Sequence, residues 1–328
     1  MIPTARQVMR VEHFGPPSAL TMVTEPLPTL GPDDVLVKVT AIGVNFADTM
    51  VRRGEYRRDQ VLPQIPGMEV AGTVVHAPPR SGLLPGATVV VFMENGGGYT
   101  DYAIAPAEMV FPVPADISGP DVAAAFLQGV TAWYAVHRYG RVAPRETVLV
   151  TGAAGGLGGT TVQLARDAGA RVFGTASTAL KRGYTEDLGC EAALDPADDE
   201  LAKKVRALTD GRGVDVVIDG VGGDLFKKAL ACLARNGRFV VVGSATQQPA
   251  MLDVRQLLPR GQTIAGFVVR NVMDSDHREP ARALEEVLLR VKNGVVKLPQ
   301  EKMPLAEAGK AHELIESRLA TGKIVLIP

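Results

Sequence analysis

The chain has only two cysteines in 328 residues, Cys190 and Cys232, and they lie far apart in the sequence. This scarcity excludes a disulfide scaffold and any zinc cluster built from four cysteines, and it is typical of a protein from a reducing cytosol. No apolar run is long enough to cross a bilayer. The N-terminal segment lacks the apolar core of a secretion signal, so we expect a cytoplasmic protein without a signal peptide.

Charge of one sign is also lacking, because the formal net charge is -1. This balance gives no reason to expect nucleic acid or an anionic membrane surface as a partner. Hydrophobic residues make up 46% and charged residues 22% of the chain, which is ordinary for a soluble globular enzyme. The length favours two domains, and no internal repeat or low-complexity segment is present.

A glycine-rich turn stands near the middle of the sequence. The aliphatic run Val148–Thr151 predicts a buried strand, and a helical pattern follows at 157–168. Between them, Ala153, Gly155 and Gly158 occupy the three positions of a small-x-Gly-x-x-Gly fingerprint. A turn without side chains lets backbone N–H groups and a helix N-terminus approach a pyrophosphate, and the last glycine allows close packing of the helix on the strand. The alternative is a purely structural turn.

Strands and helices alternate from this turn onward, which predicts a parallel, doubly wound sheet with its cofactor at the carboxyl ends of the strands. We expect strands at 148–151, 171–175, 192–194, 214–219, 238–243 and 263–269. We expect helices at 116–140, 157–168, 179–188, 199–209, 224–234 and 253–259, followed by helices at 280–293 and 306–317 and a last strand at 323–327.

Residues 6–120 have a different pattern, with short strands separated by proline and glycine. Val35, Val37 and Val39 alternate with their neighbours at a period of two, which is typical of a strand. The pattern predicts a distorted barrel or sandwich. The expected strands are 7–13, 20–25, 34–42, 70–76, 87–92 and 99–105.

Two further motifs, at Gly43–Tyr56 and Pro66–Val74, follow one another in the order GVNFAD…RxGxY…PGxExxGxV. Together with the glycine-rich turn, they resemble the zinc-independent quinone oxidoreductase branch of the medium-chain dehydrogenase/reductase superfamily. The resemblance implies an α/β protein with a doubly wound Rossmann cofactor domain, at 122–271, and a mostly β, GroES-like distorted-barrel catalytic domain, at 1–121 plus 272–328. It also implies an active site in a cleft between the domains and a homodimer formed through the cofactor domain.

The expected absence of zinc follows from the side chains available as ligands. Zinc-dependent relatives have a cysteine where this chain has Asn45, and a histidine where it has Met68. A carboxamide and a thioether are poor ligands for Zn²⁺, which binds thiolate, imidazole or carboxylate. The five histidines, at 13, 76, 137, 277 and 312, show no helical pairing. We therefore expect no bound metal.

The end of the second expected strand in the cofactor domain favours NADPH over NADH. An NAD site has an acidic residue there, whereas Gly174–Arg182 contains no carboxylate. Ser177, Lys181 and Arg182 stand where a 2′-phosphate would bind, although a solvated helix face is the alternative for the two cations. In the resemblance, Lys181 and Arg318 match phosphate-binding residues. A tyrosine often found further on in that branch is missing here, which weakens the preference for NADPH.

Other candidates for cofactor contact come from strand ends and from the resemblance. The segments 219–223 and 243–246 each follow a strand, with a structural turn as the alternative. The resemblance places Gln128 and Thr131 near the nicotinamide, with helix packing or capping as the alternative for Thr131 and packing for Trp133. The expected cofactor-binding residues are Thr131, Ala154, Gly155, Gly156, Leu157, Gly158, Ser177, Lys181, Gly243, Ser244, Phe267 and Arg318.

The expected activity is NADPH-dependent hydride transfer to a quinone or an α,β-unsaturated carbonyl compound, because such acceptors need no Lewis acid. Asn45 would contact nicotinamide or substrate, and Tyr56 would line the pocket as a donor to oxygen; a turn-forming asparagine and a rim aromatic are the alternatives. Asp48 and Arg52 brace the same loop. An enoyl-thioester reductase and a redox sensor with little turnover are the competing hypotheses. We expect substrate specificity to lie in the loops 57–64 and 271–279.

Overall fold

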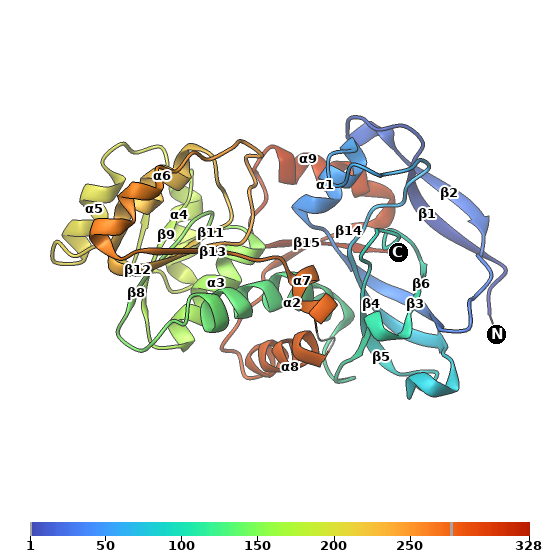
Figure 1. Cartoon of the computed structure of the whole chain (residues 1–328). Helices are drawn as coiled ribbons and strands as arrows, with labels where there is room; N and C mark the ends of the chain where they lie inside the picture. Colours follow the sequence, from blue (N-terminus) through green and yellow to red (C-terminus); the bar gives the residue numbers. More distant parts are fainter. Residues whose placement is uncertain (1, 276–277) are drawn as a thin grey trace. The chain divides into compact units, whose positions relative to one another are not determined.

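The computed structural model describes residues 2–275 and 278–328, and the chain forms two compact units (Figure 1). Unit 1 contains the chain up to Leu127 and again from Pro299, and unit 2 contains Gln128–Leu298. The sequence placed these boundaries at 121/122 and 271/272. Two positions of the expected loop 271–279, at 276 and 277, lie outside the described residues, and the second of them is His277.

Unit 1 is built on β-strands. Strands β1 (Ala5–Val11) and β2 (Leu20–Pro26) form an antiparallel pair. The larger sheet has the order β14-β15-β3-β4-β5-β7, and β6 pairs with β3. Its strands are β3 (Asp34–Gly43), β4 (Glu69–His76), β5 (Thr88–Phe92), β6 (Tyr102–Pro106), β7 (Val110–Pro112), β14 (Gln300–Pro304) and β15 (Lys323–Ile327). The chain thus returns to unit 1 at its end, where β15 lies between β14 and β3.

The segment Gly43–Tyr56 contains a helix that the sequence analysis did not predict, α1 (Phe46–Arg53). Asp48 Oδ2 accepts the Asn45 N–H at 2.8 Å just before the first turn. Gly54 ends the helix with a φ of 74°, a conformation that favours glycine. The helix α9 (Ala308–Glu316), which was expected, contacts α1 within unit 1.

Unit 2 contains the expected parallel sheet, with the strand order β10-β9-β8-β11-β12-β13. Every pair in this sheet is parallel, which confirms the doubly wound fold predicted from the strand–helix alternation. Its strands are β8 (Thr147–Val150), β9 (Arg171–Thr175), β10 (Ala192–Leu194), β11 (Val214–Asp219), β12 (Leu233–Val241) and β13 (Thr263–Gly266).

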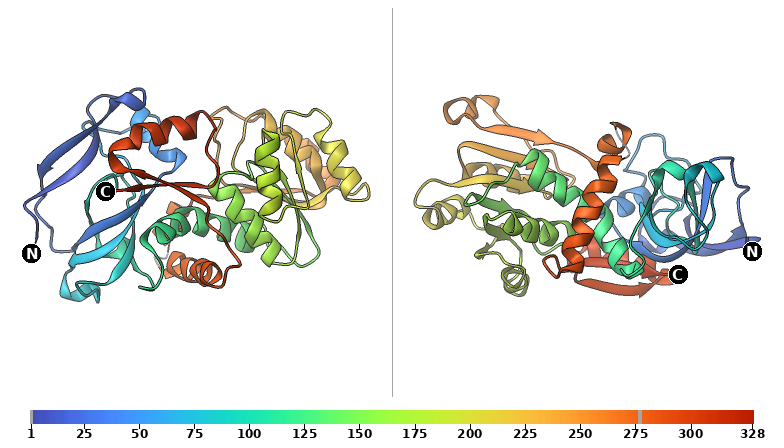
Figure 2. Two further views of the ribbon diagram at one scale, coloured as in Figure 1. Left: turned by 180° about the vertical axis from the view of Figure 1, so that it is seen from behind. Right: turned by 90° about the horizontal axis from the view of Figure 1, so that it is seen from below.

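Helices cover both faces of this sheet (Figure 2). Helices α5 (Leu201–Leu208) and α6 (Asp224–Cys232) share one apolar core with Leu149 and Phe173. Side chains alternate between faces along a strand, so Gly174 faces the other way, where α4 (Ala179–Asp187) packs over it through Thr185. Helix α3 (Gly156–Asp167) follows β8 and contacts β8 and β9.

Several boundaries in unit 2 differ from the sequence predictions. Helix α2 (Gly119–Trp133) continues into a π-helical turn at Tyr134–Tyr139 instead of running as one α-helix to residue 140. Strand β13 ends at Gly266 and α7 (Val269–Ser275) follows, where a strand to Val269 was expected. The expected helix at 253–259 is two short 3-10 turns, at Val254–Gln256 and Leu258–Arg260.

Helix α8 (Arg278–Lys292) belongs with unit 2, whereas the sequence analysis assigned it to the catalytic domain. Arg290 forms an ion pair with Asp167, at the end of α3, at 2.7 Å. Gln163 exchanges two hydrogen bonds with the backbone of Lys297 just after α8. These contacts hold the segment after α7 on unit 2.

In the described part of the chain, no helix has both the length and the apolar character required to cross a membrane.

Candidate functional site

The glycine-rich turn of unit 2 leaves β8 at its carboxyl end and leads directly into α3. Gly152 has a φ of 59°, so the left-handed position falls one residue before Ala153, which we had assigned to the first place of the fingerprint. Gly158 fits its expected role: a Cβ there would lie 2.3 Å from the Gly152 carbonyl oxygen. The helix therefore packs against the turn at a distance that only glycine allows.

The N-terminus of α3 is available for a ligand. Gly155 is its N-cap residue and provides no side-chain hydrogen bond, and the first N–H groups of an α-helix have no acceptor within the helix. Gly155 is exposed and Gly156 and Leu157 are half-buried, whereas Ala154 is buried. This arrangement of backbone donors fits the pyrophosphate of a dinucleotide.

The Gln128 side chain lies directly against this turn, because a Cβ on Gly156 would lie 2.0 Å from Gln128 Oε1. That oxygen is buried and has no hydrogen-bond partner among the described residues. A buried acceptor without a donor is costly, so the site is incomplete without a ligand or water that donates to it. The cradle around Gly155–Gly158 thus fits a bound cofactor.

The carboxyl ends of β8 and β11 are joined by Asp219. Its Oδ1 accepts from the Thr151 hydroxyl at 2.5 Å and from the backbone N–H groups of Val221 and Gly222. Gly243 and Ser244 are exposed after β12, and a Cβ on Gly222 would lie 2.8 Å from Ser244 Oγ. The two expected strand-end segments therefore lie together at this edge of the sheet.

The next strand end carries cations. Ser177 is exposed, and Thr178 Oγ1 caps α4 by accepting the Lys181 N–H at 3.2 Å. The first turn of α4 contains no acidic residue. Burial lowers the pKa of the half-buried Lys181 ammonium. A helix N-terminus that carries a cation and no carboxylate attracts an anion such as a phosphate.

The Arg182 guanidinium is engaged within unit 2, because it donates to the Ala176 carbonyl oxygen at 3.1 Å and to Asp195 Oδ2 at 3.3 Å. Asp195 belongs to the segment in which the sequence analysis noted the missing tyrosine. A phosphate at this position would compete with Asp195 for Arg182.

Three other expected cofactor residues are spread over both units. Phe267 is buried and its ring stacks on Tyr139 with the centroids 4.4 Å apart. Thr131 is half-buried in α2. Arg318 belongs to unit 1, is exposed, and has a φ of 57°. Their contact with a cofactor stays a prediction.

In unit 1, Asn45 is held by charged side chains from two strands. Lys323 Nζ donates to Asn45 Oδ1 at 2.9 Å, and Asn45 Nδ2 donates to Glu69 Oε1 at 2.8 Å and to the Gly43 carbonyl oxygen at 3.3 Å. Lys323 also donates to Glu69 Oε1 at 2.7 Å. The sequence analysis did not identify Lys323 or Glu69 as site residues.

A second buried polar group lies beneath α1. Asp48 Oδ2 accepts from Tyr99 Oη at 3.4 Å, and Tyr99 Oη lies 2.8 Å from His312 Nε2. Burial raises the pKa of Asp48 to about 7 and, together with the nearby cations Arg52 and Arg53, lowers that of His312 to about 3. Arg52 is buried and forms an ion pair with Glu316 at 2.5 Å, so Asp48 and Arg52 brace α1.

Tyr56 is half-buried beside a cavity of about 550 Å³ within unit 1. Gln60 holds the backbone on this side of the cavity, because its Oε1 accepts the N–H groups of Tyr56 and Arg57. Most of the expected specificity loop 57–64 lines the cavity, which also carries charges of both signs, from Arg10, Arg57, Glu25, Asp59 and Glu94.

The residues at the positions of the zinc ligands do not form a zinc site. Met68 is buried, and Asn45 and Glu69 are both engaged by Lys323. Within residues 2–275 and 278–328, no group of three or more His, Cys, Asp or Glu side chains is placed to hold a metal ion. An ammonium beside the Glu69 carboxylate also opposes a second cation there. This donor set does not fit Zn²⁺.

Comparison with known proteins agrees with this architecture. Residues 31–115 match the family model of the alcohol dehydrogenase GroES-like domain, and residues 156–287 match that of the zinc-binding dehydrogenase. A 2-haloacrylate reductase from a Burkholderia species is 35% identical over 91% of this chain and 92% of its own length. Quinone oxidoreductase 1 of Escherichia coli K12 is 31% identical over 90% of this chain and 91% of its own length.

Solved structures give the same result. A mycobacterial protein complexed with NADPH has a TM-score of 0.91 and 33% identity, covering 98% of this chain and all of its own. The E. coli quinone oxidoreductase complexed with NADPH has a TM-score of 0.91 and 30% identity, covering 99% of this chain and all of its own. The fold defines a two-domain oxidoreductase. The chain belongs to the medium-chain dehydrogenase/reductase superfamily, in its quinone oxidoreductase branch.

Proposed function

We propose that the protein is an NADPH-dependent, zinc-independent reductase that transfers hydride to a quinone or an α,β-unsaturated carbonyl compound. The observation that carries the proposal is the carboxyl edge of the sheet in unit 2. There, α3 begins after its N-cap residue Gly155, which provides no side-chain hydrogen bond to the helix. The first turn of α4 contains Lys181 and no carboxylate. Relatives that act on quinones or on 2-haloacrylate, and neighbours solved with NADPH, support it.

Reduced nicotinamide supplies the hydride when it is bound. The protein's own residues bind and orient: main-chain N–H groups at Gly156–Gly158 hold the pyrophosphate, and Lys181 and Ser177 hold the 2′-phosphate. A conjugated acceptor needs no metal, because its developing negative charge is spread over the conjugated system and accepted by hydrogen-bond donors. The phenol of Tyr56, beside the cavity of unit 1, is the proposed donor to that oxygen.

The charges around the cavity bear on the competing activity. Relatives include a segment of a mycocerosic acid synthase-like polyketide synthase, 31% identical over 90% of this chain but covering only 14% of that protein. Thioester carriers bear phosphates, and a basic rim would attract them. The cavity has three carboxylates and two guanidiniums, from Glu25, Asp59, Glu94, Arg10 and Arg57. This balance favours an uncharged quinone or enone over an acyl-CoA or acyl carrier protein.

The test is a steady-state assay with NADPH and with NADH against quinones, enones and enoyl thioesters. We expect oxidation of NADPH above background with 1,4-benzoquinone or an enone, and slower turnover with NADH. Faster turnover of enoyl thioesters would instead support the enoyl-thioester reductase. Tight NADPH binding without turnover of any acceptor would support a redox sensor. A homodimer formed through unit 2 and a cytoplasmic location stay predictions.

Two variants test the residues proposed in unit 1. Asn45→Ala and Tyr56→Phe are assayed with NADPH and a quinone, and Tyr102→Phe, a half-buried tyrosine on β6 outside the cavity lining, is the control. We expect the Tyr56 variant to lose about a hundredfold in kcat, the effect of one lost charge-stabilising hydrogen bond. Unchanged turnover in both Asn45→Ala and Tyr56→Phe would remove these residues from the mechanism.

A further inference from the structure

The guanidiniums of Arg10 and Arg57 line the cavity of unit 1 together with Tyr56. Some conjugated acceptors also bear a carboxylate, and a guanidinium is the side chain that binds a carboxylate through two parallel N–H bonds. What Arg10 and Arg57 already bind therefore bears on whether the cavity suits a charged or an uncharged acceptor. These side chains and the groups they bind all belong to unit 1.

Arg10, near the end of β1, is paired with two carboxylates. Its Nε and Nη2 donate to Glu12 Oε1 at 2.8 and 2.5 Å, and its Nη1 donates to Glu25 Oε2 at 3.1 Å. The hydrogen bond to Glu12, supported by Glu25, raises the pKa of the Arg10 guanidinium. All three nitrogen atoms of this guanidinium thus donate to carboxylates of the chain.

Arg57 is paired with Asp59 in the geometry that a carboxylate ligand would need. Its Nε donates to Asp59 Oδ1 at 3.0 Å and its Nη2 donates to Asp59 Oδ2 at 2.9 Å. The remaining nitrogen, Nη1, donates to Asn95 Oδ1 at 2.5 Å. The hydrogen bond to Asp59 raises the pKa of Arg57, and the charge of Glu94 adds to this shift. Asp59 therefore occupies the two-pronged face of the guanidinium.

The cations of the cavity are thus already neutralised by the chain itself. The carboxylates of Glu25, Asp59 and Glu94 also line the cavity. Each guanidinium retains N–H groups on Nη1 and Nη2, but an anion bound to them would lie near a carboxylate and be repelled by it. An acceptor without an ionised group meets no such repulsion.

The backbone around Asp59 is held by its neighbour Gln60. Gln60 Oε1 accepts the N–H groups of Tyr56 and Arg57, and its Nε2 donates to the Val51 carbonyl oxygen at 3.0 Å. The Asp59 side chain is 70% exposed. Its replacement by alanine therefore changes the charge of the cavity while Gln60 still holds the loop.

We propose that Asp59 is a positioning residue that keeps the Arg57 guanidinium occupied and thereby restricts the cavity to acceptors without a negative charge. A quinone or enone that bears a carboxylate must displace Asp59 from Arg57 or lie beside its charge. Without Asp59, Arg57 would present two parallel N–H groups to such a carboxylate. This inference rests on the proposed function, and it narrows the class of acceptors named there.

The probes are 4-oxopent-2-enoate, an enone that bears a carboxylate, and its uncharged methyl ester. The value of kcat/KM is measured for each with NADPH, and the carboxylate-to-ester ratio is compared between proteins, so that the intrinsic reactivity of the two enones cancels. We expect the wild type to prefer the ester. In Asp59→Ala the ratio is expected to rise about tenfold, the value of one charge-assisted hydrogen bond, mainly through a lower KM for the carboxylate.

Two further variants separate positioning from a change in overall charge. Asp33→Ala removes an equally exposed class of residue, an aspartate paired with an arginine, Arg80, in unit 1 but outside the cavity lining. It is expected to keep the wild-type ratio. The double variant Asp59→Ala/Arg57→Met is expected to lose the gain, because Asp59 acts through Arg57. Added salt is expected to reduce the gain in Asp59→Ala, because the attraction to Arg57 is electrostatic.

A carboxylate-to-ester ratio in Asp59→Ala equal to that of the wild type would overturn the inference and leave the proposed function standing. An equal rise in Asp33→Ala, or a gain that persists in the double variant, would overturn it as well. No oxidation of NADPH by the wild type with the ester or with 1,4-benzoquinone would overturn both.

Discussion

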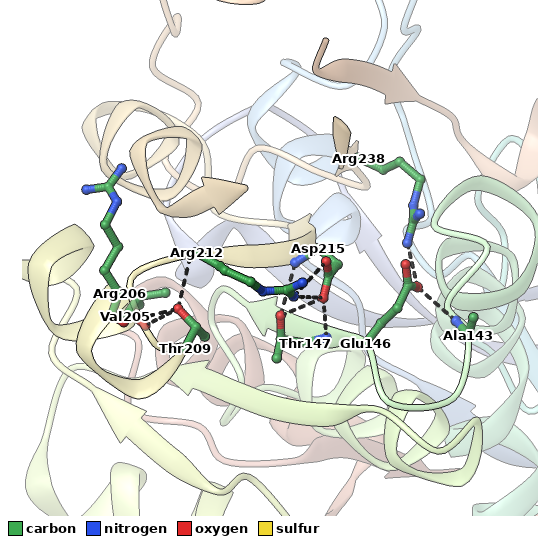
Figure 3. A network of polar contacts seen from close by, with 10 residues as sticks. Ala143, Glu146, Thr147, Val205, Arg206, Thr209, Arg212, Asp215 and Arg238 are labelled. Carbon is green, nitrogen blue, oxygen red and sulfur yellow. Dashed lines mark hydrogen bonds and ion pairs between the residues drawn. The ribbon is translucent and has the colours of Figure 1, made fainter. Parts of the chain in front are cut away.

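The two ends of the parallel sheet in unit 2 differ in what fills them. At the amino end, most side chains bond to one another (Figure 3): the Thr147 N–H and hydroxyl donate to Asp215 Oδ2, both at 2.8 Å, and Arg238 donates to Glu146 at 2.6 Å, although Arg238 Nε has no partner among the described residues. At the carboxyl end, glycines form the turn after β8, and buried oxygens of Gln128 and Asp219 lack partners among the described residues. One end is closed for stability, and the other leaves main-chain donors for a ligand.

Unit 1 contains two groups of buried polar side chains that also differ from each other. Asn45, Glu69 and Lys323 are joined by three contacts, one of which is also an ion pair, whereas the pKa values of Asp48 and His312 lie far from their usual range. A cluster of buried polar side chains does not by itself identify a ligand site. A ligand site is indicated by hydrogen-bond donors and acceptors that the protein itself does not satisfy.

The largest expected effect is at the carboxyl end of the sheet. Gly158→Ala places a methyl group 2.3 Å from the Gly152 carbonyl oxygen, so the turn and α3 must separate. We expect NADPH affinity to fall at least about a hundredfold, measured by nicotinamide fluorescence. The control is Gly183→Ala, in α4 with open space around it, which is expected to keep affinity and add about 0.5–1 kcal/mol of stability. Equal affinities for both variants would contradict a cradle at Gly158.

The next effect concerns the buried titrating pair of unit 1. Burial raises the pKa of Asp48 to about 7, so between about pH 4 and 7 the folded state holds a proton that the unfolded state has lost, and stability falls as pH rises. His312, with a pKa of about 3, makes stability fall as pH drops below about 6.5. The two slopes oppose each other, at about 1.4 kcal/mol per pH unit each.

Single variants separate these slopes in urea unfolding at several pH values. Asp48→Asn keeps an acceptor for the Asn45 N–H, and its stability should fall toward acid because only His312 remains. His312→Gln should lose stability from about pH 4 to 7 because only Asp48 remains. Two flat profiles would show that neither group is perturbed as the geometry implies.

A smaller effect is expected at the second strand end. Lys181→Ala should weaken NADPH binding about tenfold and leave NADH binding unchanged, because the 2′-phosphate is present in NADPH and absent from NADH. Lys203→Ala, on α5 and exposed, is the matched control. Equal losses for both cofactors would place Lys181 outside the phosphate site.

The smallest effect is expected at the amino end of the sheet. Glu146→Gln weakens the bond to Arg238 in a partly exposed ion pair and should cost about 1 kcal/mol of stability. NADPH affinity should change less than about twofold. A large loss of affinity from this variant would remove the functional difference between the two ends.

The fold was predictable where the signal was local. Val148–Thr151, the glycines after it and the β-branched runs of the other strands predicted the parallel sheet within a few residues. Helix α1 was missed because its apolar positions are few and its start depends on Asp48 bonding back to Asn45. Helix α8 was predicted as a helix but assigned to the wrong unit, because the contacts that place it, to Asp167 and Gln163, are tertiary.

The candidate site was predictable only in part for the same reason. Gly158, Lys181 and Asn45 stand in short motifs, so the sequence predicts them as candidates. Glu69 and Lys323 are 254 residues apart, and no local pattern connects a lysine at the start of the last strand to a carboxylate at the start of β4. Their contacts with Asn45 fix which way its carboxamide points.

The proposed function requires a dinucleotide bound through backbone N–H groups at the carboxyl end of β8. The most direct measurement is a calorimetric titration of the wild-type protein with NADPH, with Gly158→Ala in parallel. We expect one NADPH per chain for the wild type and binding at least about a hundredfold weaker for the variant. Absence of NADPH binding to the wild type, or full binding to the variant, would contradict it.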